Sequence, residues 1–197
     1  EQELSFVKSE NLSHSQAGFV YLSASSDNPA SFNITGTLKI KGRLDVERFS
    51  QAFNQVMDHH EVLRTCFLAT PGSSQVMQHV KKNATPRLYC LQSTKETADA
   101  DVKTIFDQIA KHEYSIATGD TLRATLVSHD AHLHTLVMGY HNIVLDPASI
   151  GFIFADINLA YQSQPLPTDS PSYMDYARQQ IRDLEAGRLN ASIDYWN

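Results

Sequence analysis

The chain has 197 residues, of which 42% are apolar and 19% charged, and its net charge is −6. This is the composition of one globular domain with a sizeable core, and the acidic balance argues against nucleic-acid binding, which needs a basic face. No apolar run is long enough to cross a membrane and no signal peptide opens the chain, so we expect a cytoplasmic protein with neither nucleic acid nor membrane as a partner.

Helical and strand patterns alternate along the chain, and Ser13 and Asp45 are expected to cap the first two helices. In chain order, the patterns predict a helix over 12–22, a strand over 31–40, a helix over 46–57, strands over 64–70, 75–80 and 87–91, a helix around 102–109, strands over 122–127 and 133–141, a helix after 147 and a last helix over 173–186. This interleaved order predicts an α/β sandwich with a mixed sheet covered by helices. No glycine-rich phosphate loop is present, so a nucleotide-binding fold is not predicted.

Residues 139–147 are the most informative segment of the chain. An apolar strand pattern ends in the polar pair His141 and Asn142. Three apolar residues follow, and then Asp146 and Pro147, a pair typical of a helix N-cap followed by proline at the first helical position. The pattern predicts a strand-to-helix junction at which polar side chains either take part in chemistry or hold the junction together.

Several histidines raise the question of a metal site. His59 and His60 end a helix, where a cap or a solvent contact is expected rather than a metal. His129, His132 and His134 lie around a turn between two strands, but neither a cysteine nor a carboxylate completes a recognisable zinc spacing. The sequence therefore predicts a surface hairpin at this turn and no metal site.

The two cysteines, Cys66 and Cys90, both fall in apolar segments with strand character. Buried free thiols are expected at both positions rather than a disulfide, as is usual in a reducing compartment.

Three motifs, in order along the chain, resemble the condensation domains of nonribosomal peptide synthetases. Residues 13–22 are similar to the family's opening pattern S-x-A-Q-x-R-L-W-x-L, residues 60–67 match H-E-x-L-R-T-x-F, and residues 141–147 align with the active-site pattern H-H-x-x-x-D-G. The closing Tyr195-Trp196 resembles the end of the family's first lobe. The residues around the motifs look like those of fungal polyketide synthase–peptide synthetase hybrids, a type similar to the condensation domain of lovastatin nonaketide synthase.

The resemblance implies a lobe like that of chloramphenicol acetyltransferase, and it implies that residues 1–197 are the N-terminal lobe of a two-lobed domain whose second lobe is absent from this chain. In the family, the active site lies in a tunnel between the lobes. The implied partners are acyl or peptidyl carrier domains of the same megasynthase, the C-terminal lobe and a carrier-bound polyketide. No cofactor would bind directly, because the carrier domains deliver phosphopantetheine.

The active-site motif departs from the family pattern at two positions. The resemblance places Asn142 where the family has its second histidine, the base or positioner of the attacking amine. An amide cannot take up a proton near neutral pH, and losing a general base costs about 10²–10⁴ in rate. The motif's glycine is replaced by Pro147, which fixes φ and removes an N–H.

The resemblance also assigns a structural role to Asp146, which would pair with Arg64. We expect this ion pair to fasten the strand after the second helix to the active-site loop. Breaking a buried pair of this kind would cost about 3–5 kcal/mol.

Three functions remain open. The first is a condensation-type domain of a fungal megasynthase with its own amide-forming activity lost or reduced, retained for carrier docking or architecture. The second is an active acyltransferase in which the proton is transferred by a substrate group or by His141, which is otherwise expected to be a hydrogen-bonded core histidine. The third is an interaction module whose tunnel is closed.

Overall fold

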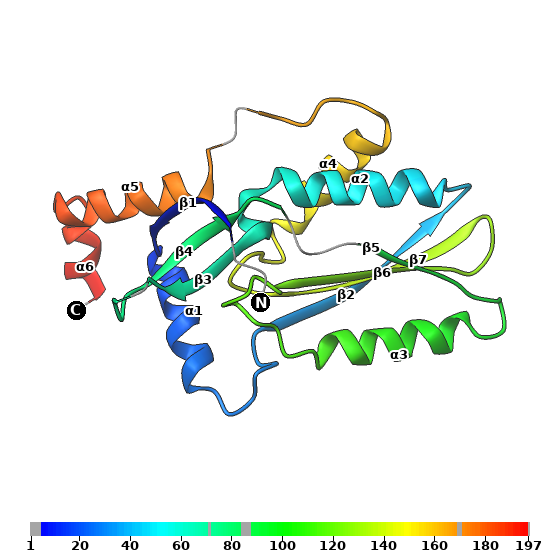
Figure 1. Ribbon diagram of the computed structural model, residues 1–197, viewed down its shortest axis with the longest axis horizontal. Coiled ribbons are helices and arrows are strands. Elements are labelled where there is room, and N and C mark those ends of the chain that lie inside the picture. Colours follow the sequence, from blue (N-terminus) through cyan, green and yellow to red (C-terminus); the bar gives the residue numbers. More distant parts are fainter. Residues whose placement is uncertain (1–4, 71, 84–87, 169–170, 197) are drawn as a thin grey trace.

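The computed structural model describes residues 5–70, 72–83, 88–168 and 171–196. Its helices and strands form two sheets with helices packed on them (Figure 1). In chain order the elements are β1 (Phe6–Asn11), α1 (His14–Ser25), β2 (Asn33–Lys41), α2 (Val46–His59), a short 3₁₀ helix η1 (Glu61–Arg64), β3 (Thr65–Ala69), β4 (Val76–Lys81), β5 (Leu88–Gln92), α3 (Ala98–Ala110), β6 (Leu122–Ser128), β7 (Leu133–His141), α4 (Ile150–Tyr161), α5 (Tyr173–Glu185) and α6 (Asn190–Trp196).

The larger sheet has four strands in the order β2-β7-β6-β5. Strand β7 pairs antiparallel with β2 and with β6, whereas β5 runs parallel to β6. A parallel pair needs a crossover connection, and helix α3 provides it between β5 and β6. The predicted mixed sheet covered by helices is therefore confirmed.

The smaller sheet has three antiparallel strands in the order β1-β4-β3, and α1 and α5 lie beside it (Figure 1). Sequence patterns missed β1, because its six residues, FVKSEN, are mostly exposed and include no sustained apolar alternation. The short helix α6 was also missed, and none of its residues is buried. Both elements carry little of the apolar periodicity on which such predictions depend.

Local capping interactions fix the starts of the first two helices. The Ser13 side chain accepts a hydrogen bond from the backbone N–H of Gln16, and the Gln16 side chain accepts one from the backbone of Ser13, which together form a capping box. The Asp45 carboxylate accepts a hydrogen bond from the N–H of Arg48 at 3.0 Å. The two predicted N-caps are confirmed.

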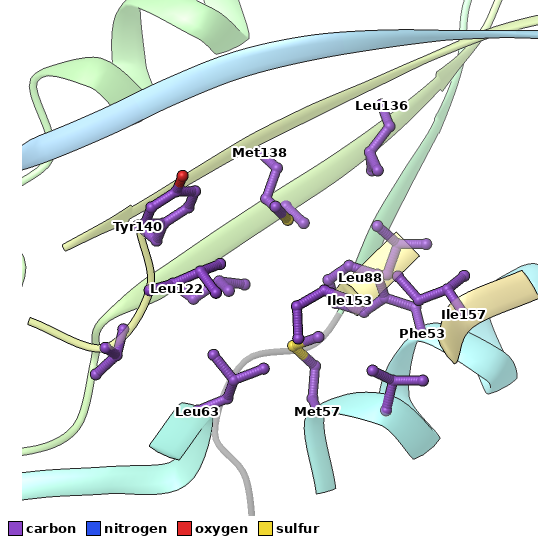
Figure 2. Close-up of a cluster of buried hydrophobic side chains, with 14 of the residues drawn as sticks. Phe53, Met57, Leu63, Leu88, Leu122, Leu136, Met138, Tyr140, Ile153 and Ile157 are labelled. Atoms are coloured by element: carbon purple, nitrogen blue, oxygen red, sulfur yellow. The ribbon is translucent and has the colours of Figure 1, made fainter. Parts of the chain in front are cut away.

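The apolar core lies between the four-stranded sheet and helices α2 and α4, while α3 covers the other face of that sheet (Figure 1). Figure 2 shows side chains of α2 and α4 facing the inward residues of the sheet. The labelled members of this cluster are Phe53, Met57, Leu63, Leu88, Leu122, Leu136, Met138, Tyr140, Ile153 and Ile157. Successive side chains of a strand point to opposite faces, so Tyr140 faces this core and its neighbours on β7, Gly139 and His141, face the other way.

Candidate functional site

Residues 141–147, which resemble the pattern H-H-x-x-x-D-G, span the end of β7 and the turns that lead to α4. Strand β7 ends at His141, residues 142–144 form a turn, and α4 begins at Ile150 with Ser149 as its N-cap. The prediction that Asp146 caps the helix and Pro147 is its first residue was therefore wrong. The Asp146 carboxylate instead accepts a hydrogen bond from the N–H of Ser149 at 2.7 Å, which closes an extra turn before the helix.

His141 points into the protein interior. Its side chain is 2% exposed and lies near the rings of Phe19 and Phe32, with centroid separations of 6.2 and 5.8 Å. Its Nδ1 accepts a hydrogen bond from the N–H of Ile143 at 3.1 Å, so the proton of the neutral ring is on Nε2, 3.4 Å from Ser23 Oγ. Burial lowers the pKa of His141 from 6.5 to about 4.

The geometry of His141 bears on its chemical role. Both ring nitrogens already have partners inside the protein, and the ring is neutral at pH 7. These are the features of a hydrogen-bonded core histidine.

Asn142 has a different environment from its neighbour. Its backbone N–H donates to Phe32 O at 2.9 Å, and its side chain is half-buried at the wall of a pocket of about 430 Å³. The side-chain Oδ1 is buried and has no hydrogen-bond partner among the described residues. The pocket is lined by Ser15, Gln16, Phe19, His60, Val62, Asn142, Ile143, Val144, Leu145, Asp146, Ser149, Phe152, Ile153 and Tyr173.

The predicted ion pair between Arg64 and Asp146 is wrong. Arg64 Nε donates to Asp58 O at 3.0 Å and Nη1 donates to Lys81 O, while Nη2 lies 3.9 Å from Glu61 Oε1. Asp146 lies on an exposed turn, where hydrogen bonds from Ser149 hold the pKa of its carboxyl below the usual range. Each group is thus satisfied locally, and Arg64 fastens the end of α2 to strand β4 instead of to the motif turn.

His60 forms a contact that the sequence patterns did not reveal. Its backbone N–H bonds to Val56 O and ends α2, which agrees with the predicted cap, but its Nε2 also lies 2.8 Å from Asp156 Oδ2. Asp156 belongs to α4 and is 8% exposed. The sequence did carry a signal for this contact, because Asp156 lies inside the otherwise apolar stretch 153–157 and a buried charge requires a partner. His59 Nε2 lies 3.0 Å from Pro167 O.

The predicted hairpin between β6 and β7 is confirmed and His132 is exposed at its turn, but the other two histidines are buried. His129 and His134 are 8% and 2% exposed, and they contact Thr135 Oγ1 and Ser128 Oγ at 2.8 and 2.9 Å. Both are buried polar residues that hydrogen-bond to hydroxyl groups of β6 and β7. Among the described residues, no group of three or more histidine, cysteine or carboxylate side chains could hold a metal ion.

The cysteines are both free, and they differ in environment. Cys66 is buried, as predicted, and burial raises its pKa to about 11. Cys90 is exposed on the edge strand β5, so its predicted burial was wrong. Across the described part of the chain, no helix is both long and apolar enough to cross a membrane.

Fold and site together describe a mixed α/β domain whose His-Asn turn borders a pocket beside the first helix. The family model of the condensation domain matches residues 8–197. The chain therefore belongs to the condensation-domain family.

Relatives and solved structures agree with this assignment. The chain is 32% identical over 191 residues to the polyketide synthase–nonribosomal peptide synthetase ffsA of Aspergillus flavipes, a match that covers 97% of this chain and 5% of ffsA. It is 31% identical over 193 residues to the hybrid PKS-NRPS synthetase opdA of Penicillium oxalicum, covering 96% of this chain and 5% of opdA. The chain thus spans only a small part of these curated relatives.

Among solved structures, the condensation domain from the monacolin K polyketide synthase MokA matches with a TM-score of 0.88 and 26% identity. That match covers 98% of this chain and 43% of the MokA chain. The first condensation domain of the calcium-dependent antibiotic synthetase matches with a TM-score of 0.83 at 14% identity, which shows a shared fold.

Proposed function

We propose that residues 1–197 form the N-terminal lobe of a condensation-type domain in a fungal polyketide–nonribosomal peptide megasynthase, and that the domain's own amide-forming activity is lost or reduced. The family membership and the hybrid synthetases among the relatives support the megasynthase context. The 43% coverage of the MokA chain agrees with one lobe of a larger domain.

One observation carries the proposal of reduced activity. Asn142 borders the pocket, whereas His141 faces away from it with both ring nitrogens in use. On the family pattern, the residue beside the attacking amine would then be an amide, which can position a group by hydrogen bonding but cannot accept its proton. The burial of His141 also disfavours the alternative in which that residue handles the proton.

The retained role would be to receive phosphopantetheine-linked chains from carrier domains and to support the architecture of the domain together with a C-terminal lobe. Exposed aromatic side chains support a covering partner. Phe152, at the pocket, is 74% exposed, and Tyr195 and Trp196 in α6 are 78% and 84% exposed. The rings of Tyr195 and Trp196 lie 5.1 Å apart between centroids, so these two form a small exposed cluster of the kind that marks an interaction surface.

The test uses the complete two-lobed domain of the parent and an acyl group loaded on its carrier. We expect slow or no amide formation by the natural sequence, and an increase of about 10²–10⁴ in rate for Asn142→His. Asn142→Gln is the matched control, because it changes the size of the side chain without adding a proton acceptor. Natural turnover that His141→Ala abolishes without unfolding the domain would favour the active acyltransferase instead. Failure of the loaded carrier to bind would favour a closed interaction module.

A further inference from the structure

A histidine–carboxylate pair lies in the same pocket as Asn142. His60 Nε2 and Asp156 Oδ2 are 2.8 Å apart, and their side chains are 28% and 12% exposed. His60 borders the 430 Å³ pocket that contains Asn142 and also an adjoining depression of about 700 Å³. The His60 imidazole therefore lies between the pocket and the depression and is accessible to solvent, whereas its Asp156 partner is more deeply buried.

The pair has the hydrogen-bond pattern of a general base. An ionised carboxylate only accepts hydrogen bonds, so the Nε2 facing Asp156 carries the ring proton and Nδ1 keeps its lone pair. Nδ1 makes no hydrogen bond to any described residue and is not among the buried polar atoms. A carboxylate that fixes the tautomer of a histidine while the other nitrogen stays free is the arrangement used to activate nucleophiles.

We infer that His60, oriented by Asp156, accepts the proton that Asn142 cannot accept, and that whatever amide formation the domain retains passes through this pair. The inference rests on the proposed function, because it takes amide formation to occur in this pocket. The amine nitrogen of the acceptor forms a bond to the thioester carbonyl carbon, and the carbon–sulfur bond to phosphopantetheine breaks. The proton lost by the nitrogen goes to His60 Nδ1 and from there to the departing thiolate.

His59 provides the matched control. It precedes His60 and its ring lies 5.1 Å from that of His60 between centroids, but it borders only the larger depression and contacts Pro167 O. A substitution of His59 therefore disturbs the same helix end without touching the pocket that contains Asn142.

The experiment measures amide formation by the complete domain in its parent, with acyl-loaded carrier and amine acceptor. His60→Gln removes the base, but its amide N–H can still donate to Asp156, so the structural tie is kept. We expect this variant to lose about 10²-fold or more of the residual rate, and His59→Gln to stay within about twofold of the natural rate. Added imidazole should restore turnover to His60→Ala, an effect that a merely structural contact would not produce.

The Asn142→His background separates this inference from the proposed function. If Asn142→His restores fast turnover, His60→Gln should lower the rate of amide formation only slightly in that background, because the new histidine at position 142 accepts the proton instead of His60. A natural rate that His60→Gln leaves unchanged, or a natural sequence with no measurable turnover, overturns the role of His60 while leaving the carrier-docking proposal intact. If Asn142→His is also inactive and the loaded carrier does not bind, the proposed function itself fails.

Discussion

The core between the four-stranded sheet and helices α2 and α4 adjoins the pocket at the end of β7, but the two regions differ in how their polar groups are satisfied. In the core, the side chains that α2 and α4 turn toward the sheet are buried against apolar neighbours (Figure 2). In the pocket, Asn142 Oδ1 has no partner among the described residues and an imidazole–carboxylate pair is partly open to solvent. A buried polar atom without a partner is costly for a fold, so the free Asn142 Oδ1 is available to a group bound in the pocket, whereas the core is explained by packing alone.

The largest expected effect is in the core. Phe53 of α2 is fully buried, and Phe53→Ala should lower the free energy of unfolding by about 3–5 kcal/mol because it removes apolar contacts and leaves a cavity. Urea denaturation followed by circular dichroism measures the change. Phe152→Ala, at a side chain that is 74% exposed in α4, is the matched control and should change stability by no more than about 0.5 kcal/mol. Equal losses for the two variants would contradict the contrast between core and pocket.

The second effect is the pH dependence of stability that the buried His141 causes. The pKa of His141 is about 4 in the folded chain and 6.5 for a solvent-exposed histidine of the unfolded chain, so the unfolded chain binds its proton first as the pH falls. The stability contributed by the neutral ring is present above pH 6.5 and is lost between pH 6.5 and about 4, by about 3 kcal/mol at most.

The measurement is a series of urea denaturation curves from pH 7 to pH 4 for the natural chain and for His141→Gln. We expect the variant to lose less stability over this range than the natural chain. Burial also lowers the pKa of His134, which acts in the same direction in both proteins. A profile that is the same with and without His141 would show that its ring is not held neutral in the interior.

The third effect is a loss of stability at Gly139, on the face of β7 that points away from the core. A Cβ added to Gly139 would meet the side chain of Ile109 and lie 2.8 Å from Thr35 Oγ1 and 3.0 Å from Tyr114 Oη. Gly139→Ala should therefore destabilise the chain by about 1–3 kcal/mol through overpacking. Gly36, on the neighbouring strand β2, has open space around it, and Gly36→Ala should be neutral or slightly stabilising. Thermal or urea denaturation of the two variants tests the close packing of α3 on the sheet.

The smallest effect is a coupling close to zero between Arg64 and Asp146. Arg64→Met should cost about 1.5–3 kcal/mol because it removes charged hydrogen bonds to two backbone carbonyls. Asp146→Ala should cost about 1 kcal/mol because it removes a cap-like hydrogen bond to Ser149. The two losses should add within about 0.5 kcal/mol in the double variant. A larger coupling in the denaturation data would restore the ion pair that the family pattern predicts.

Much of the fold could be predicted from local signals. The caps at Ser13 and Asp45, the amphipathic face of α2 and the end of β7 at His141 are each encoded within a few residues. Strand β1 escaped prediction because an edge strand with exposed residues carries no apolar period. At Asp146 and Pro147 the local signal was misleading, because the Asp146 carboxylate bonds to the N–H of Ser149 and closes a separate turn before the helix begins.

The sequence by itself determined that a histidine and an asparagine stand side by side at the end of a predicted strand. Only the tertiary structure decided which of the two meets the pocket, since this depends on which faces of β7 the helices cover. It also decided the partners of Arg64 and brought His60 to Asp156, which lies 96 positions away in the chain. Side-chain contacts of this kind depend on long-range packing, and neither periodicity nor motif spacing encodes them.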